Sequence, residues 1–416
     1  MNYTTASSGP SFDLQISKGS KKLVLFFSGV GARDGRFQYW RVGKSLGTHC
    51  LFLSDGRKHW YQDGVEGLGS SVDETVVNIR RQAAALGVTG IYAIGQSMGA
   101  YGAILYGAKL GASVLAFGAE TILGLEASRS ERLRRDDAAI LYPNLHDVIA
   151  SAEKPVFAFA GEEDPVDLYC ASKASGLPNY HPRTIAGQGH HLAAYLHQTD
   201  RLIPLLRAFV DGPSLPFTGE EGDALACSGL ADAFYDLHRH MWAGRPVEAI
   251  EAGRRTISIK GDLHVALYLT AKALLGTGQA SEAVGFAEKA LALAPNNASY
   301  KFLLANSLTK LGELDRAMTL LKEAIAAEPD LAAAHNQIAG IHYRQGNFPA
   351  AREASRRALQ LQPGHPTYTR LLDRIEKRIA LLSTQDASPE QDASSPLAAK
   401  VTNLFRSLKG TVVRRS

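Results

Sequence analysis

The second half of the chain repeats itself every 34 residues, and this period constrains the fold more than any other feature. Glycine, proline and alanine each recur in one register. A glycine inside each unit ends one helix, a proline at the end of the unit starts the next connection, and small alanines let paired helices approach closely. The period therefore predicts stacked helix pairs. The recurring positions are Gly244, Gly278, Gly312 and Gly346; Pro295, Pro329 and Pro363; and Ala249, Ala283, Ala317 and Ala351.

This pattern resembles the tetratricopeptide repeat (TPR), in which two-helix units stack into a solenoid. The first unit departs from the pattern, as terminal units that cap a stack commonly do. The resemblance implies an all-α TPR solenoid over residues 230–382, with a groove that binds a protein partner. The expected units are 230–263, 264–297, 298–331 and 332–365, followed by a capping helix at Tyr368–Leu382.

Short apolar runs alternate with helical patterns in the first half of the chain. The runs lack polar alternation, which favours strands buried on both faces of a parallel sheet. The alternation predicts a doubly wound, mostly parallel α/β domain over residues 1–212. Proline, glycine and acidic residues then predict a linker over 213–229. The expected strands are Leu23–Phe27, His49–Leu53, Ile91–Ile94, Ser113–Phe117 and Pro155–Ala160.

The sequence Gly-Gln-Ser-Met-Gly at residues 95–99 lies between an apolar strand and a helical pattern. A GxSxG sequence in this context is typical of a nucleophile elbow, where a serine occupies a sharp strand-to-helix turn. Residues 10–210 resemble an α/β-hydrolase fold domain. The resemblance implies a serine nucleophile, here Ser97.

The resemblance also implies an acid and a histidine that follow the serine along the chain. His190, in a Gly-Gln-Gly-His turn, is the expected base, and His191 is its alternative. Serine is a weak nucleophile until an imidazole accepts its proton, and a buried carboxylate fixes the tautomer of that imidazole.

Asp164 is the expected acid because it directly follows a buried strand, and the proline after it favours extended backbone at the strand exit. Glu120, at the end of the preceding strand, is the alternative acid. Three neighbouring carboxylates are placed second, namely Glu162, Glu163 and Asp167.

Two backbone N–H groups are expected to form the oxyanion hole, those of Met98 and Val30. Loops at the carboxyl ends of parallel strands line ligand sites in such sheets, so polar and aromatic residues there predict a substrate pocket. A charged segment, Thr121–Glu153, is interpreted as a surface helix, and the resemblance implies a small lid as its alternative. The predicted pocket residues are Tyr39, Asp55, Trp60 and Tyr61.

Residues 383–416 are first polar and then basic, which predicts a disordered basic tail. The alternative interpretation is a short basic amphipathic helix in this tail that weakly contacts an anionic membrane surface or an acidic partner. A net charge of +4 is too balanced to indicate nucleic-acid binding. The three cysteines are scattered, without the spacing of a metal site, and favour a reducing compartment. No apolar run reaches the roughly 20 residues of a transmembrane helix. We therefore expect a cytoplasmic protein.

These features together predict a serine hydrolase that acts on a carboxylic ester through an acyl-enzyme, without metal or cofactor. The repeats would dock a protein partner or the substrate. One alternative is a scaffold in which the hydrolase-like domain is catalytically silent. Another is an acyltransferase or deacylase that acts on a glycan, since one fold hosts many chemistries.

Overall fold

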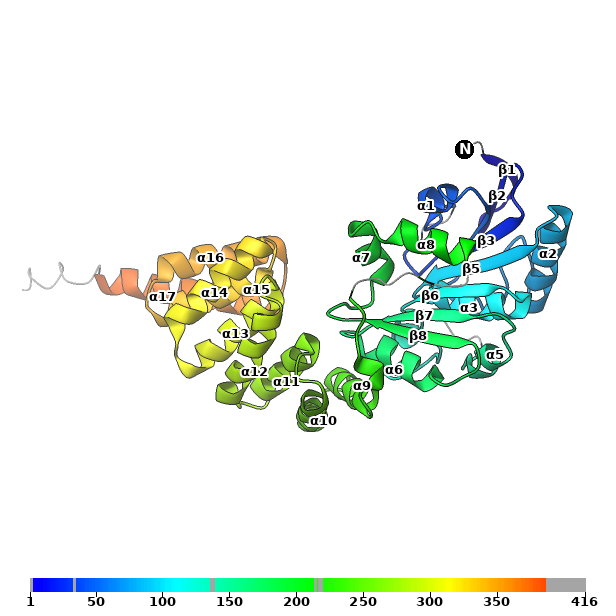
Figure 1. Ribbon diagram of the computed structural model, residues 1–416. Coiled ribbons are helices and arrows are strands. Elements are labelled where there is room, and N and C mark those ends of the chain that lie inside the picture. The colour runs from blue at the N-terminus through cyan, green and yellow to red at the C-terminus, as the bar shows by residue number, and fades with distance from the viewer. Residues whose placement is uncertain (1–2, 33–34, 135–138, 213–214, 216–219, 387–416) are drawn as a thin grey trace, which may run out of the picture. The chain divides into compact units, whose positions relative to one another are not determined.

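The computed structural model describes residues 3–32, 35–134, 139–212, 215 and 220–386 of the chain (Figure 1). The chain divides into two compact units, Met1–Ala294 and Pro295–Ser416. The expected tail from residue 387 onward, with its basic amphipathic helix, lies outside the described residues.

An eight-stranded mixed sheet forms the centre of the first unit, in the order β1-β2-β4-β3-β5-β6-β7-β8 (Figure 1). Strand β2 pairs antiparallel with both β1 and β4, whereas the pairs from β4 to β8 are parallel. The sheet is thus parallel in its larger part, with an antiparallel edge that the sequence analysis did not predict. The strands are Tyr3–Ser8 (β1), Phe12–Ser17 (β2), Lys22–Phe27 (β3), His49–Leu53 (β4), Gly90–Gln96 (β5), Ser113–Phe117 (β6), Val156–Gly161 (β7) and Tyr180–Ile185 (β8).

Helices cover both faces of this sheet. Successive residues of β3 alternate between two hydrophobic cores: Leu25 and Phe27 belong to one core, Val24 and Phe26 to the other. Side chains of a strand point to opposite faces in turn, so a strand covered on both sides must be apolar throughout. The helices are Trp40–Lys44 (α1), Val72–Ala85 (α2), Met98–Leu110 (α3), Arg129–Leu133 (α4), His146–Ala150 (α5), Pro165–Ala174 (α6), Leu192–Gln198 (α7) and Leu202–Asp211 (α8).

The first four helices of the repeat region belong to the same compact unit as the sheet. Leu168 of α6 lies in one hydrophobic core with Leu230 and Phe234 of α9. We expected the α/β domain to end at 212 and a linker to separate it from the repeats, but the compact unit continues through the linker to Ala294. These elements are Ala224–Ala226 (η1), Leu230–Trp242 (α9), Pro246–Ile259 (α10), His264–Gly276 (α11) and Ala280–Leu293 (α12).

The second unit continues the helix pairs. Gly312 and Gly346 have left-handed φ angles of 85° and 76°, which glycine adopts without strain, and each follows the first helix of its pair. Ala317 and Ala351 are buried where the paired helices meet. The last helix, α17 at Pro366–Asp386, covers the expected capping helix and includes the first four residues that we assigned to the tail. The other helices are Ala298–Leu311 (α13), Leu314–Ala327 (α14), Ala332–Arg344 (α15) and Phe348–Leu361 (α16).

No helix within the described ranges is both long enough and apolar enough to span a bilayer.

Candidate active site

Ser97 lies in a strained turn between β5 and α3. Its φ and ψ are 59° and −127°, a conformation that residues with a side chain rarely adopt. A Cβ atom at Gly95 would lie 2.1 Å from the Gly99 carbonyl oxygen, and one at Gly99 would lie 2.2 Å from the Phe27 carbonyl oxygen. Both glycines of the GxSxG sequence are therefore required by close backbone contacts around the serine.

His190 is held beside this turn, in the loop between β8 and α7. Its Nδ1 lies 2.7 Å from Oδ2 of Asp167, and both side chains are buried. Its Nε2 has no hydrogen-bond partner among the described residues. A carboxylate on Nδ1 fixes the tautomer that leaves Nε2 free to accept a proton.

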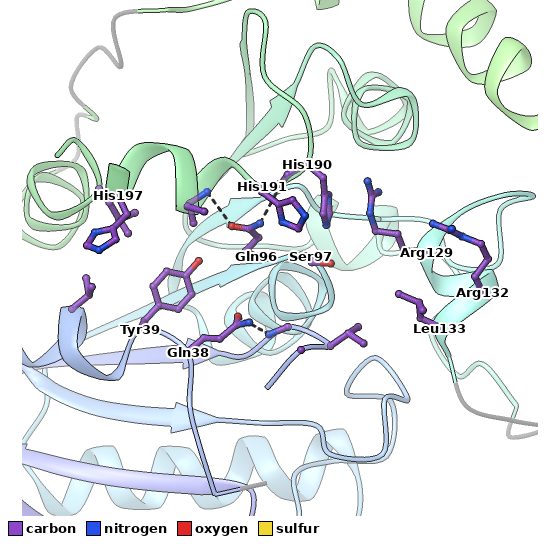
Figure 2. A pocket seen from close by; sticks show the side chains of 17 residues that line it. Gln38, Tyr39, Gln96, Ser97, Arg129, Arg132, Leu133, His190, His191 and His197 are labelled. Carbon is purple, nitrogen blue, oxygen red and sulfur yellow. Dashed lines mark hydrogen bonds between the residues drawn. The ribbon is translucent and has the colours of Figure 1, made fainter. Parts of the chain in front are cut away.

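Gln96 connects the histidine loop to the serine turn. Its side-chain amide donates to the His190 carbonyl oxygen at 3.2 Å, and its carbonyl oxygen accepts from the Ala193 N–H at 3.0 Å (Figure 2). The residue just before Ser97 thereby fixes the backbone that carries His190.

Gly118, after β6, leaves the space that the His190–Asp167 pair occupies. A Cβ at this position would lie 2.7 Å from Asp167 Oδ2 and 2.8 Å from His190 Nδ1.

Burial lowers the pKa of His190, but the Asp167 carboxylate outweighs this effect, so that the pKa is raised overall.

The aspartate bound to His190 is Asp167, whereas we expected Asp164. Asp164 is the N-cap of α6, and its Oδ1 accepts from the Asp167 N–H at 2.9 Å. Because a capping side chain accepts from the backbone of its own helix, the Asp164 carboxylate bonds to the Asp167 N–H and not to His190. The sequence signal was present: Asp164-Pro165 reads as an N-cap followed by the proline favoured at the first helical position, which makes Asp167 the carboxylate of the first turn.

Asp164 is bound instead by the guanidinium of Arg129. Burial alone would raise the pKa of Asp164, but Arg129 outweighs it and holds that pKa below its ordinary value. Glu120, our alternative acid, accepts from the backbone N–H groups of Arg129 and Ser130. Neither expected acid is therefore bonded to His190.

Asp164, Asp167 and His190 also offer ligand atoms within 4.8 Å of one another, close enough to bind a cation. The Arg129 guanidinium lies on both carboxylates, so the positive charge that this cluster binds is supplied by the chain itself.

A cavity of about 710 Å³ opens over Ser97 and is lined by His190 as well. Figure 2 shows the side chains that surround it, with Tyr39 and His197 at one end and Arg129 and Arg132 at the other. Residues from the loop after β3, from α1, from α4 and from α7 contribute to its walls. The serine and the histidine are thus brought to one cavity that is large enough for a small-molecule substrate.

Both expected oxyanion-hole residues lie near Ser97: Val30 lines the same cavity, and Met98 is the next residue along the chain. Val30 lines the cavity, and its loop is held by the Gly29 N–H, which donates to Gln38 Oε1 at 2.9 Å (Figure 2). Met98 is the first residue of α3, and the N–H groups of a first helical turn have no partner within the helix. The Met98 N–H therefore has no acceptor within α3, whereas the Ala100 and Tyr101 N–H groups donate to the Ser97 carbonyl oxygen.

Of the four predicted pocket residues, only Tyr39 lines this cavity. Trp60 and Tyr61 are 1% and 0% exposed and belong to the core below it. The Tyr61 hydroxyl donates to the Ser28 carbonyl oxygen at 2.8 Å. Asp55 accepts from the Tyr61 N–H and lines a separate cavity of about 200 Å³. Further lining residues that were not predicted as pocket residues are Gln38, Gln96, Arg129, Arg132, His191 and His197.

The loop between β7 and α6 also binds the first repeat helices. The Glu163 carboxylate accepts from the N–H groups of His264 and Val265, which open α11. Burial raises the pKa of Glu163 to about 7. The ring of Tyr169 on α6 lies 4.4 Å from that of Tyr235 on α9. One short segment therefore contacts His190 on one side and the repeats on the other.

Comparison with known proteins identifies only the repeats. The tetratricopeptide repeat family model matches residues 302–366, and the model of anaphase-promoting complex, cyclosome, subunit 3 matches residues 247–324. No curated protein matches the chain. The C-terminal half therefore carries tetratricopeptide repeats, a class whose stacked helices typically bind other proteins.

Several solved structures resemble the repeats. MamA 41-end from Desulfovibrio magneticus RS-1 is 22% identical, with a TM-score of 0.34, and the match covers 43% of this chain and 97% of that one. A thermophilic TPR protein of Thermus thermophilus is 20% identical, with a TM-score of 0.33, covering 43% of this chain and 99% of that one. The first TPR of Spaghetti (RPAP3), bound to an HSP90 peptide, is 19% identical, with a TM-score of 0.27, covering 28% of this chain and 93% of that one.

Proposed function

We propose that this chain is a serine hydrolase of the carboxylic-ester type, with an α/β-hydrolase fold in its N-terminal part. One observation carries the proposal. Ser97, in a strained strand-to-helix turn, and His190, which is bonded through Nδ1 to the buried Asp167, line one cavity. Their order along the chain, serine, acid and histidine, is that of the α/β hydrolases.

The reaction follows from this arrangement. The Ser97 hydroxyl oxygen attacks the ester carbonyl carbon while His190 Nε2 takes its proton, and Asp167 stabilises the imidazolium that forms. The N–H groups of Met98 and Val30 donate to the oxyanion of the tetrahedral intermediate. Its collapse breaks the ester bond, and the alcohol leaves with the proton from His190. Water then attacks the acyl-enzyme by the same route, which releases the carboxylic acid and restores Ser97.

The repeats bind a protein partner, or the substrate itself, through their groove. The proposal for this part of the chain rests on the repeat class, in which stacked helix pairs form a concave surface suited to a peptide or a helix.

Replacement of Ser97 tests the enzymatic proposal. Ser97→Ala should lower kcat for p-nitrophenyl butyrate by about 10⁶, the typical cost of losing a triad nucleophile. A fluorophosphonate probe should label the wild-type chain once, at Ser97, and should not label the variant. Ser151→Ala, an exposed serine at the end of α5, is the matched control and should keep wild-type kinetics. If neither the wild type nor Ser97→Ala hydrolyses the ester or is labelled, the proposal is wrong and the scaffold interpretation takes its place.

A further inference from the structure

Three carboxylates are buried together behind the candidate active site. Glu120, Asp164 and Asp167 are 2%, 8% and 1% exposed. Burying like charges side by side is costly unless a cation compensates them, because the low dielectric strengthens their repulsion.

Arg129 contacts all three of these carboxylates. Its guanidinium lies 3.5 Å from Glu120 and 3.4 Å from Asp167, and it also pairs with Asp164. Glu120 in turn accepts from the backbone N–H of Arg129 at 2.9 Å, so one carboxylate both pairs with the side chain and holds its backbone. The arginine is thereby fixed next to the carboxylate that bonds to His190.

We propose that Arg129 is a positioning residue of the esterase: its guanidinium holds the Asp167 carboxylate directed at His190 Nδ1, so that His190 can serve as the base. This inference rests on the proposed function. Arg129 acts through Asp167 and makes no bond to the reacting atoms in this scheme.

The charges around His190 predict how loss of Arg129 changes the pKa of His190, and with it the pH dependence of activity. The groups that act on the imidazole are Asp167, Asp164, Arg129 and the neighbouring His191. The two aspartates raise the pKa of His190, and Arg129 lowers it. Without the guanidinium, either the imidazolium is stabilised further or the carboxylates bind a proton. In the first case the proton must leave the His190 imidazolium, and in the second it must leave the carboxylates, before His190 can accept a proton from Ser97. Activity should therefore begin at a higher pH.

The test is the pH profile of kcat/KM for p-nitrophenyl butyrate in Arg129→Met and Arg129→Lys. In Arg129→Met the acid limb should move up by about one pH unit, the usual effect of removing a nearby charge, with at least about a tenfold loss below neutral pH. Arg129→Lys keeps the charge and should keep the limb near its wild-type position. Arg254→Met removes an exposed arginine that pairs with Glu282 and serves as the control. An unshifted limb in Arg129→Met, with kcat/KM lowered equally at every pH, would show a merely structural role and overturn the proposal.

Thermal unfolding gives a second readout that needs no esterase activity. In the wild type the pKa of Asp164 is held low, so its stabilisation is present above the unfolded pKa and is lost as the pH falls. In Arg129→Met, Asp164 loses the guanidinium that lowers its pKa while burial still raises that pKa, so the variant should lose stability as the pH rises. The difference in Tm between the two should therefore widen from pH 5 to pH 8.

A difference in Tm that is independent of pH would contradict the proposal even if wild type and Ser97→Ala proved equally inactive, which would instead defeat the proposed function. The double variant Glu120→Gln with Arg129→Met removes one carboxylate together with the cation. It should regain part of the lost Tm, and it keeps the test available if the single variant does not fold.

Discussion

At the scale of single residues, Asp164 and Asp167 are three positions apart but have different roles. Asp164 caps α6 and pairs with Arg129, whereas Asp167 reaches Nδ1 of His190. The start of α6 determines which aspartate bonds to His190, because the side chain at the N-cap, here Asp164, accepts from the backbone of the first turn.

Exchange of each aspartate for asparagine separates the two roles. Asp167→Asn should lower kcat for p-nitrophenyl butyrate by about 10⁴, because an amide favours the wrong histidine tautomer. Asp164→Asn is the matched control: asparagine caps a helix as well as aspartate does, so α6 should persist and the loss should be far smaller. If Asp164→Asn were the more damaging change, the assignment of Asp167 would be wrong.

The same two residues show what the sequence could and could not predict at the site. Ser97 and His190 could be predicted to share one cavity because each lies in a short glycine-containing turn that the local sequence indicates. The choice among the carboxylates of residues 162–167 depends on where a helix begins, and the position of Trp60 depends on packing below the sheet rather than on its place after a strand. Local patterns predicted the residues of turns, whereas long-range packing decided which side chains face the cavity.

At the scale of elements, the loop from β7 to α6 is a junction. Its Glu163 accepts from the first two N–H groups of α11, at the positive end of that helix dipole. The period of the repeats predicted α11 correctly, but no pattern in the sequence predicted that a loop of the sheet would cap it. Such a contact joins positions about a hundred residues apart.

The raised pKa of Glu163 makes this junction sensitive to pH. Because the folded pKa, about 7, lies above the unfolded value, the folded state binds the extra proton between the two, and stability decreases as the pH rises through that window. Glu163→Gln cannot ionise, so its Tm relative to wild type should increase from pH 5 to pH 8. Glu282→Gln, on the exposed face of α12, is the control. A Tm difference that does not change with pH would show that Glu163 stays ionised throughout.

At the scale of the whole molecule, the boundary between compact units falls inside the repeat region. The proline, glycine and acidic residues within 213–229 predicted a linker there, but Leu168 of α6 shares a hydrophobic core with α9. Composition reports where a chain can bend, whereas a compact unit ends where apolar contacts end.

Truncation distinguishes the two boundaries. A fragment of residues 1–294 should fold cooperatively and keep the small-ester activity of the full chain. A fragment of residues 1–212 would expose Leu168 and Tyr169, and should precipitate or unfold about 10 °C or more lower, because several kcal/mol of apolar burial are lost. Circular dichroism and p-nitrophenyl butyrate turnover are the measurements. Equal Tm values for the two fragments would place the boundary at the linker after all.

The capping of α11 by Glu163 distinguishes two groups of repeats: those that contact the sheet-containing unit and those that do not belong to it. Repeats are commonly regarded as interchangeable parts, which can be added, deleted or swapped between proteins to change what is bound. Here the first two pairs cannot be exchanged freely, since they contact the loop before α6 through Glu163 and pack against α6, the helix that carries Asp167. Only the pairs from Pro295 onward form a compact unit of their own and are free to diversify toward new partners, so an engineer who wants a new specificity should begin there.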